Sequence, residues 1–163
     1  MKSIFHRTSV RAYDSRDVEP EKITMLLKAA MAAPSAGNQQ PWEFYVVKDP
    51  EKKALLSTCS PYSGCAKNAP VIIVPCCRKE ATFPENITMD LSAATENILL
   101  AADAQGLGSV WLGIAPVEDR MKAVAQVLSL PDNLIPFALL PVGYPQMVRP
   151  QQDRYDESRI HHV

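Results

Sequence analysis

The sequence MDLSAATENILLAADAQGLGSVWL, which runs from Met89 to Leu112, decides the fold class of this chain. Residues 89–105 carry the longest helical pattern, and its apolar residues are not confined to one stripe. The stripe consists of Leu91, Ala94, Ile98 and Ala101, while further apolar groups lie elsewhere around the helix at Leu99, Leu100, Ala102 and Ala104. A helix that is apolar on several faces is a buried helix. In a chain of only 163 residues, this pattern indicates that a partner subunit covers part of it.

Two glycines follow this helix. Gly106 is expected to cap its C-terminal end, and residues 109–112 are expected to form a strand. The order helix, Gly106-Leu107-Gly108, strand is the reverse of the order in dinucleotide-binding folds, where the glycines follow a strand and open a helix. No Walker P-loop is present in the sequence either. The chain is therefore predicted to form a single α+β domain over residues 1–163.

Helices and strands alternate on both sides of this stretch. The patterns predict helices at residues 20–32, 50–56 and 117–128, the last ended by Pro131, and strands at residues 44–47, 71–74 and 137–142. The strand at residues 71–74 is continuously apolar, which is typical of a central strand covered on both faces.

The composition is that of a globular protein without a nucleic-acid or membrane partner. Hydrophobic residues make up 47% of the chain, and 17 Lys and Arg balance 18 Asp and Glu. The sequence pI is 6.3, whereas nucleic-acid-binding domains usually exceed about 9. Three prolines interrupt the longest charge-free stretch, residues 133–148. The N-terminus lacks the apolar region of a secretory signal, and the four cysteines form no C-x-x-C pair, so we expect a cytoplasmic location.

The motifs of hydrolytic and metal chemistry are missing from the sequence. It contains no G-x-S-x-G and no H-E-x-x-H, and its histidines are expected at the surface: His6, His161 and His162. Cys76 and Cys77 end a buried strand and are expected to act as small hydrophobes. We therefore predict no metal site and no catalytic side chain. An enzyme with such a sequence takes its reactivity from a bound cofactor.

An N-terminal cluster, Arg7-Thr8-Ser9-Val10-Arg11, is the first candidate binding site. In an extended segment the alternating residues Arg7, Ser9 and Arg11 point to one side. Two guanidinium groups with a hydroxyl between them suit a phosphate, because arginine donates parallel charge-assisted hydrogen bonds. The alternative is a solvated polar N-terminus.

The second candidate is the loop between the first helix and the first strand, Pro34-Ser35-Ala36-Gly37-Asn38-Gln39-Gln40-Pro41-Trp42. Hydroxyl and amide groups can donate and accept hydrogen bonds, which suits the edge of a heterocycle that offers both kinds of partner. A plain turn would need only one of these residues.

Both clusters, taken with three later segments, resemble the FMN-dependent nitroreductase family. The matching residues are, in chain order, Arg7-x-Ser9-x-Arg11-x-Tyr13, Ala33-Pro34-Ser35-x-x-Asn38-x-Gln40-Pro41-Trp42, Asp90 with Asn97-Ile98-Leu99-Leu100-Ala101-Ala102, Gly106-Leu107-Gly108-Ser109 with Trp111, and Gly143-Tyr144-Pro145. The resemblance covers nearly the whole chain. It implies a three-layer α/β/α sandwich with a mixed, mainly antiparallel sheet, and an intertwined homodimer with FMN at each end of the interface.

The resemblance also implies which residues bind FMN. Contacts to the phosphate and ribityl chain would come from Arg7, Thr8, Ser9, Arg11 and the tail residue Arg154, and contacts to the flavin from the other subunit would come from Pro34, Ser35, Ala36 and Asn38. Leu112 and Gly113 match the segment whose backbone N–H lies near flavin N5, where the missing Cβ of glycine allows a close approach. Gln152 replaces a lysine that the family often has at this place in the tail. Lys67 and Asn68 lie near the family's pyrimidine contacts without the same spacing and stay unassigned.

The implied activity is that of an FMN-dependent oxidoreductase. NADH or NADPH would pass a hydride to flavin N5, and a flat conjugated acceptor such as a nitroaromatic or quinone would then be reduced in the same place, by a ping-pong mechanism. Two alternatives stay open: a relative with another flavin task, such as reductive dehalogenation, and a flavin-binding module without turnover. The chain is short for the family in the segment that usually shapes the substrate pocket, so the sequence selects neither the acceptor nor the nicotinamide donor.

Overall fold

The computed structural model describes residues 1–148 and 150–163. At its centre is a six-stranded sheet. The strands β2 (Val71–Arg78) and β6 (Ala138–Gly143) lie in the middle, with β1 (Trp42–Val47) on one side and β3 (Gly108–Ser109) on the other. Two short strands complete the sheet: β4 (Leu112–Gly113) pairs with β6, and β5 (Leu134–Pro136) pairs with β2. All of these pairs are antiparallel, and a single parallel bridge joins Ser9 to Ser109, as the prediction of a mixed, mainly antiparallel sheet requires.

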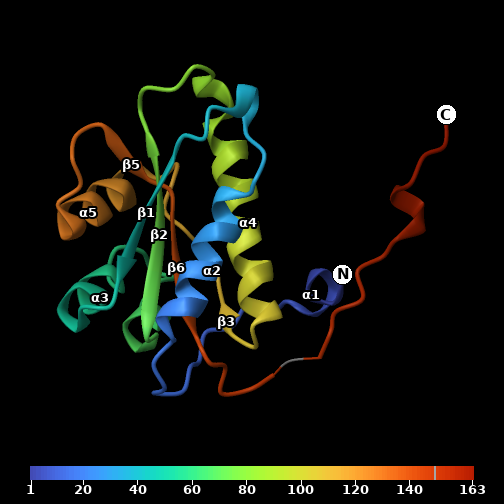
Figure 1. The fold of residues 1–163 in the computed structure, drawn as a ribbon, viewed down its shortest axis with the longest axis horizontal. Helices are drawn as coiled ribbons and strands as arrows, with labels where there is room; N and C mark the ends of the chain where they lie inside the picture. The colour runs from blue at the N-terminus through green and yellow to red at the C-terminus, as the bar shows by residue number, and fades with distance from the viewer. Residues whose placement is uncertain (149) are drawn as a thin grey trace.

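Helices cover both faces of the sheet (Figure 1). One face is covered by α2 (Pro20–Met31) and α4 (Ile87–Ala104), and the other by α3 (Pro50–Leu56) and α5 (Glu118–Leu128). A short N-terminal helix, α1 (Lys2–His6), packs against α4. Short 3-10 segments, η1 to η4, lie at Ala36–Asn38, Gly64–Asn68, Pro84–Asn86 and Glu157–Arg159. The predicted three-layer α/β/α sandwich is therefore confirmed. None of the described helices is long and apolar enough to cross a membrane.

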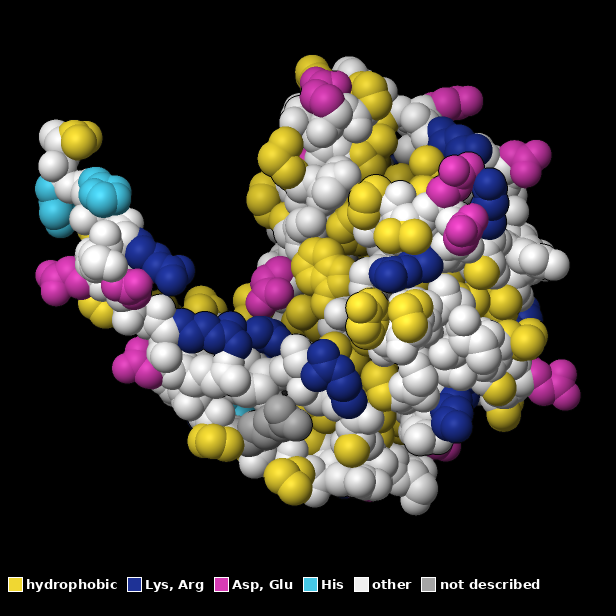
Figure 2. All heavy atoms as spheres, turned by 180° about the vertical axis from the view of Figure 1, so that it is seen from behind, with side chains coloured by type: hydrophobic (Ala, Val, Ile, Leu, Met, Phe, Trp, Pro, Cys, Tyr) yellow, Lys and Arg dark blue, Asp and Glu magenta, His cyan; other side chains and the backbone are white. Residues whose placement is uncertain are grey.

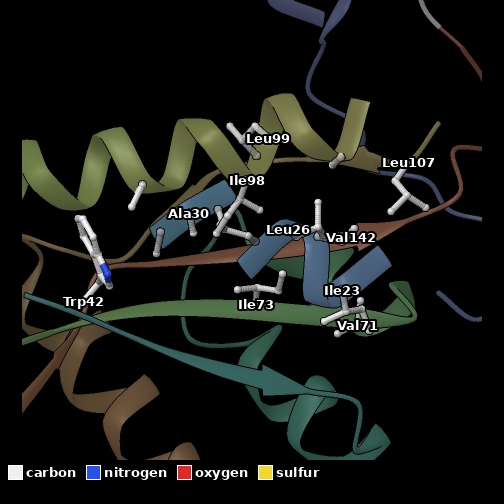
Figure 3. Packing of buried hydrophobic residues seen from close by; sticks show 14 of the residues in the cluster. Ile23, Leu26, Ala30, Trp42, Val71, Ile73, Ile98, Leu99, Leu107 and Val142 are labelled. Atoms are coloured by element: carbon white, nitrogen blue, oxygen red, sulfur yellow. The ribbon is translucent and has the colours of Figure 1, made fainter. Parts of the chain in front are cut away.

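Strand β2 supplies both hydrophobic cores, because successive side chains of a strand point to opposite faces. Val71 and Ile73 pack in the cluster that contains Leu26 of α2 and Ile98 of α4, as Figure 3 shows. The alternate residues Ile72 and Val74 pack in the second cluster, beneath α3 and α5. The continuous apolar pattern thus identified a central strand correctly.

Pro75 does not interrupt this strand, which extends beyond the continuously apolar run at residues 71–74. Residues 71–73 of β2 pair with β6, whereas residues 76–78 pair with β5. Pro75 stands where one partner strand is exchanged for the other, and its carbonyl accepts from the Phe137 N–H at 2.8 Å. A proline without an N–H is tolerated at such a junction. The strand therefore continues through Cys76 and Cys77, which are buried as expected, and burial raises the pKa of the Cys76 thiol to about 12.

One expectation needs correction, and two short elements were not predicted. The strand predicted at residues 109–112 is two short strands, β3 and β4, because Ser109 is also paired with the N-terminal segment. Helix α5 ends at Leu128, as predicted and ahead of Pro131, since Ser129 adopts a left-handed conformation (φ 51°) and the Leu130 N–H bonds back to the Ala125 carbonyl. The elements α1 and β5 were not predicted, because five-residue and three-residue segments carry too few residues for a periodic pattern.

Candidate functional site

The N-terminal cluster lies along the edge of the sheet beside β3. Ser9 forms a parallel bridge with Ser109, and the Val10 N–H donates to the Ser109 carbonyl at 2.9 Å. The segment is extended at this point, as predicted. Gly108 permits the approach, because a Cβ at this position would lie 2.7–2.8 Å from three side-chain carbons of Val10.

We therefore expect Gly108→Ala to lower the free energy of unfolding by about 1–3 kcal/mol, because a methyl group in this contact overpacks it. Denaturation in urea at fixed protein concentration measures the change. Gly64→Ala is the matched control, since the space around Gly64 is open, and we expect a change within about 0.5 kcal/mol. The double substitution Val10→Ala/Gly108→Ala should be more stable than the sum of the single effects, and simple additivity would contradict the packing argument.

An ion pair of Arg7 and a hydrogen bond of the preceding His6 fasten the beginning of this cluster to α4. The Nε of Arg7 lies 3.4 Å from Oε1 of Glu96, and Nδ1 of His6 lies 2.7 Å from Oδ1 of Asp103. His6 is therefore a half-buried, paired residue, and its expected place at the open surface was wrong. No local pattern announces the pair, because Asp103 follows His6 by 97 residues.

Arg7 and Thr8 line a small hollow of about 70 Å³ between the N-terminal segment, the end of α4 and β3. Its wall includes Leu99, Gly108 and Ser109. A pocket that encloses a small-molecule ligand usually measures about 300–1,000 Å³. Within one chain this hollow is therefore too small to enclose a whole cofactor.

Arg11 differs from Arg7 in its surroundings. It is exposed, and within the described part of the chain no carboxylate lies within 4.0 Å of it. Burial raises the pKa of the Cys65 thiol in η2, and the positive charge of Arg11 opposes that rise. The two arginines therefore interact with different elements, Arg7 with α4 and Arg11 with η2. The unassigned Lys67 and Asn68 also belong to η2 and are exposed.

The loop of the second cluster is held in shape by its own polar groups. The Ser35 hydroxyl oxygen accepts from the Gln40 N–H at 3.0 Å, and the Gln40 amide donates to Oδ1 of Asn38 at 2.8 Å. Gly37, Asn38 and Gln40 all have positive φ angles. A Cβ on Gly37 would lie 2.3 Å from the Phe83 ring, so only glycine fits there.

A buried carboxylate fixes this loop to α4. Asp90 is 4% exposed and accepts from the Ala36 N–H at 2.9 Å and from Nε2 of Gln39 at 2.6 Å. Gln39 also bonds both backbone groups of Phe83. In the sequence Asp90 was only a motif match. Its charge within an otherwise apolar helix face was the signal of a structural role.

Pro34, Ser35 and Ala36 line a second, open hollow together with Met89, Asp90 and Ala93. It shares no lining residue with the hollow at Arg7 and Thr8. The structure therefore does not bring the two predicted groups of binding residues together within one chain.

Leu112 is buried in β4, and Gly113 follows it on the surface. The Gly113 carbonyl accepts from Nη1 of Arg120 at 3.1 Å. A Cβ on Gly113 would meet nothing within 4 Å. The packing of this chain by itself does not require glycine there.

Arg154 lies in the exposed C-terminal tail, where its guanidinium donates to the side chain of Gln152. The tail stands off from the body, and Figure 2 shows arginine side chains along it in dark blue. Within the described chain, Arg154 forms no hydrogen bond or ion pair with the N-terminal cluster.

Solved structures and curated relatives share this architecture. The structure of an FMN-dependent nitroreductase from Clostridium difficile superposes with a TM-score of 0.91 at 31% identity and covers 99% of this chain and 98% of that one. An Archaeoglobus fulgidus protein named "Putative NADH dehydrogenase/NAD(P)H nitroreductase" is 44% identical over 166 residues, 99% of this chain and 95% of its own length. An iodotyrosine deiodinase from Haliscomenobacter hydrossis is 29% identical over 189 residues, with 95% and 84% coverage.

The fold and its two polar clusters thus define an α+β sandwich of the nitroreductase class. The family model described as "Nitroreductase family" matches residues 4–60 and 57–144. This chain belongs to the nitroreductase family and is accordingly an oxidoreductase.

Proposed function

We propose that this protein is an FMN-dependent NAD(P)H oxidoreductase that reduces a flat conjugated acceptor. One observation carries the proposal: in this chain of the nitroreductase family, residues predicted to bind FMN line two separate hollows, Arg7 and Thr8 in one and Pro34, Ser35 and Ala36 in the other. Each group is pre-shaped by its own contacts, and neither encloses a ligand by itself. A cytoplasmic location, expected from the cysteine usage, belongs to the same proposal.

The donor set fits the parts of FMN. Arg7, Thr8, Ser9 and Arg11 are the cationic and hydroxyl groups that a phosphate and a ribityl chain require. Arg11 is exposed, so its guanidinium donors are available to a phosphate. The open space at Gly113 leaves room for a flat ring near the backbone. Arg154 would join the site only if the tail reaches it in the assembled protein.

A second copy of the chain completes the site. Helix α4 has 18 residues and is about 27 Å long. Asp90, near its first residue, contacts the Pro34–Asn38 loop, and Asp103, near its last residue, contacts His6 of α1. A partner placed antiparallel would bring its Pro34–Asn38 loop to the Arg7 end of this chain. Met89, 62% exposed on α4, and the tail that stands away from its own body supply apolar and extended surface for such a partner.

When bound, FMN supplies the electron chemistry, in which N5 accepts a hydride from NADH or NADPH and the electrons pass to the acceptor. The role of the chain itself is to bind FMN and to orient it. Arg7 and Arg11 would hold the phosphate, the Ser35 and Asn38 side chains would meet the heterocycle, and the missing Cβ of Gly113 would allow its backbone to approach the ring. Donor and acceptor would occupy one place in turn, so we expect ping-pong kinetics.

The test is a visible spectrum of the purified protein, followed by anaerobic addition of NADH and then NADPH. Flavin bands that bleach with either donor are expected. Parallel initial-rate lines with a quinone or nitroaromatic acceptor would support the shared site. A colourless protein that does not take up added FMN would overturn the proposal.

The shared site also predicts how the protein responds to dilution. Because each FMN would contact both subunits, we expect dilution to release FMN at the same protein concentration at which the dimer dissociates. Analytical ultracentrifugation with detection of protein and flavin absorbance measures both events. A folded monomer that retains FMN would contradict the dimeric site.

Reductive dehalogenation is a second candidate, favoured by the similarity to an iodotyrosine deiodinase. It would use the same binding residues with a halogenated aromatic substrate. Release of halide with a halogenated tyrosine, together with no turnover of quinones and nitroaromatics, would select this candidate.

A further inference from the structure

The carbonyl of Gly113 is held by a cationic side chain that the candidate FMN site does not use. Arg120, the third residue of α5, donates from Nη1 to this carbonyl at 3.1 Å. A guanidinium carries five N–H donors in a planar fork, so further donors remain for another partner.

An aromatic ring lies close to the same guanidinium. Cζ of Arg120 lies 5.6 Å from the centre of the Tyr62 ring, within the range of a cation–π contact of about 6 Å. Tyr62 belongs to the turn before η2 and is 71% exposed, while Arg120 is half-buried. The Arg120 guanidinium thus contacts both an exposed aromatic ring and the Gly113 carbonyl.

The charge of Arg120 is not neutralised by an ion pair. Within residues 1–148 and 150–163, no carboxylate lies within 4.0 Å of its guanidinium. The nearby Glu118 pairs instead with Lys122 at 2.8 Å. A guanidinium beside an aromatic ring suits a flat ligand with an anionic group, because the ring can stack and the anion can take the parallel N–H donors.

We propose that Arg120 and Tyr62 form the acceptor-binding surface beside Gly113 and select flat aromatic acceptors that carry a carboxylate or another anionic group. This inference rests on the proposed function, since it places the acceptor next to the residue assigned to flavin N5. Arg120 binds the anionic group, and Tyr62 supports the ring. The acceptor is then a flat aromatic molecule with an anionic group rather than any conjugated molecule.

The test uses FMN-loaded protein and two redox-inactive probes of the same shape, 2-naphthoate and 2-naphthamide. Calorimetric titration gives the dissociation constant of each probe. We expect the wild-type protein to bind naphthoate at least about tenfold more tightly than naphthamide, and the preference to fall with added salt. Arg120→Ala should abolish the preference, Arg120→Lys should retain part of it, and Tyr62→Leu should weaken both probes equally.

Lys122→Ala is the matched control. Lys122 is a cation on the same helix, but it is already paired with Glu118, so its removal should not change the preference for naphthoate over naphthamide. FMN affinity is measured for every variant. Arg120→Ala protein that keeps FMN and loses the preference supports the inference. An unchanged preference, or an Arg120→Ala effect confined to FMN affinity, overturns it and leaves Arg120 with a structural role at Gly113. Failure of the wild-type protein to bind FMN or to bleach with NAD(P)H would instead overturn the proposed function.

Discussion

Arg11→Ala weakens FMN binding by about 1.5–3 kcal/mol, or about 10- to 150-fold, if Arg11 holds the phosphate, because this is the usual contribution of a hydrogen bond to a charged group. Arg11 is exposed and forms no ion pair within the described chain, so the substitution should leave the fold intact. Quenching of FMN fluorescence on titration with apoprotein measures the affinity.

Lys52→Ala provides the control for this change. Lys52 is an exposed cation on α3, and it belongs neither to the N-terminal cluster nor to an element that contacts it in the site described above. Its removal should therefore leave FMN affinity unchanged. Equal effects of the two substitutions would mean that only the overall charge matters. An unchanged affinity in Arg11→Ala would remove Arg11 from the phosphate site.

Asp90→Ala should have the largest effect on stability, lowering the free energy of unfolding by about 2–4 kcal/mol. The substitution removes two hydrogen bonds to a charged acceptor and leaves the Ala36 N–H without a partner. It also frees the loop at Pro34–Asn38, so FMN affinity should fall together with stability. Chemical denaturation at fixed protein concentration measures the first effect, and flavin titration measures the second.

Asp90→Asn is the informative companion. Its amide oxygen can still accept from Ala36, although it offers a weaker acceptor to Gln39, so the loss should be less than half of that in Asp90→Ala. If Asp90→Ala remained within about 0.5 kcal/mol of the wild type, the carboxylate would not be what holds the loop.

The layers and the central strand could be predicted from local pattern. The apolar run at residues 71–74 fixes a strand covered on both faces, and the helical periods at residues 20–32 and 89–105 match α2 and α4 closely. The order of glycines after α4 excludes a dinucleotide-binding fold. Each of these features is set by residues that lie close together in the chain, so a local sequence pattern is enough to predict it.

The candidate site was predictable as residues but not as an arrangement. The arginines and the polar loop are visible in the sequence, and the resemblance names their ligand. That Arg7 pairs with Glu96, that Asp90 holds the Ala36 N–H, and that Arg120 reaches Gly113 depend on segments brought together only by folding.

The sequence by itself determined the α+β class, the central strand, the long helix and the family of this protein, because periodicity and short motifs are local properties of a chain. The tertiary structure alone decided how the predicted binding residues are divided between two hollows and which buried carboxylate holds the loop. It also decided which cation lies beside Gly113. Such contacts join residues that are distant in the sequence, and only the packing of α4, α5 and the sheet brings them together.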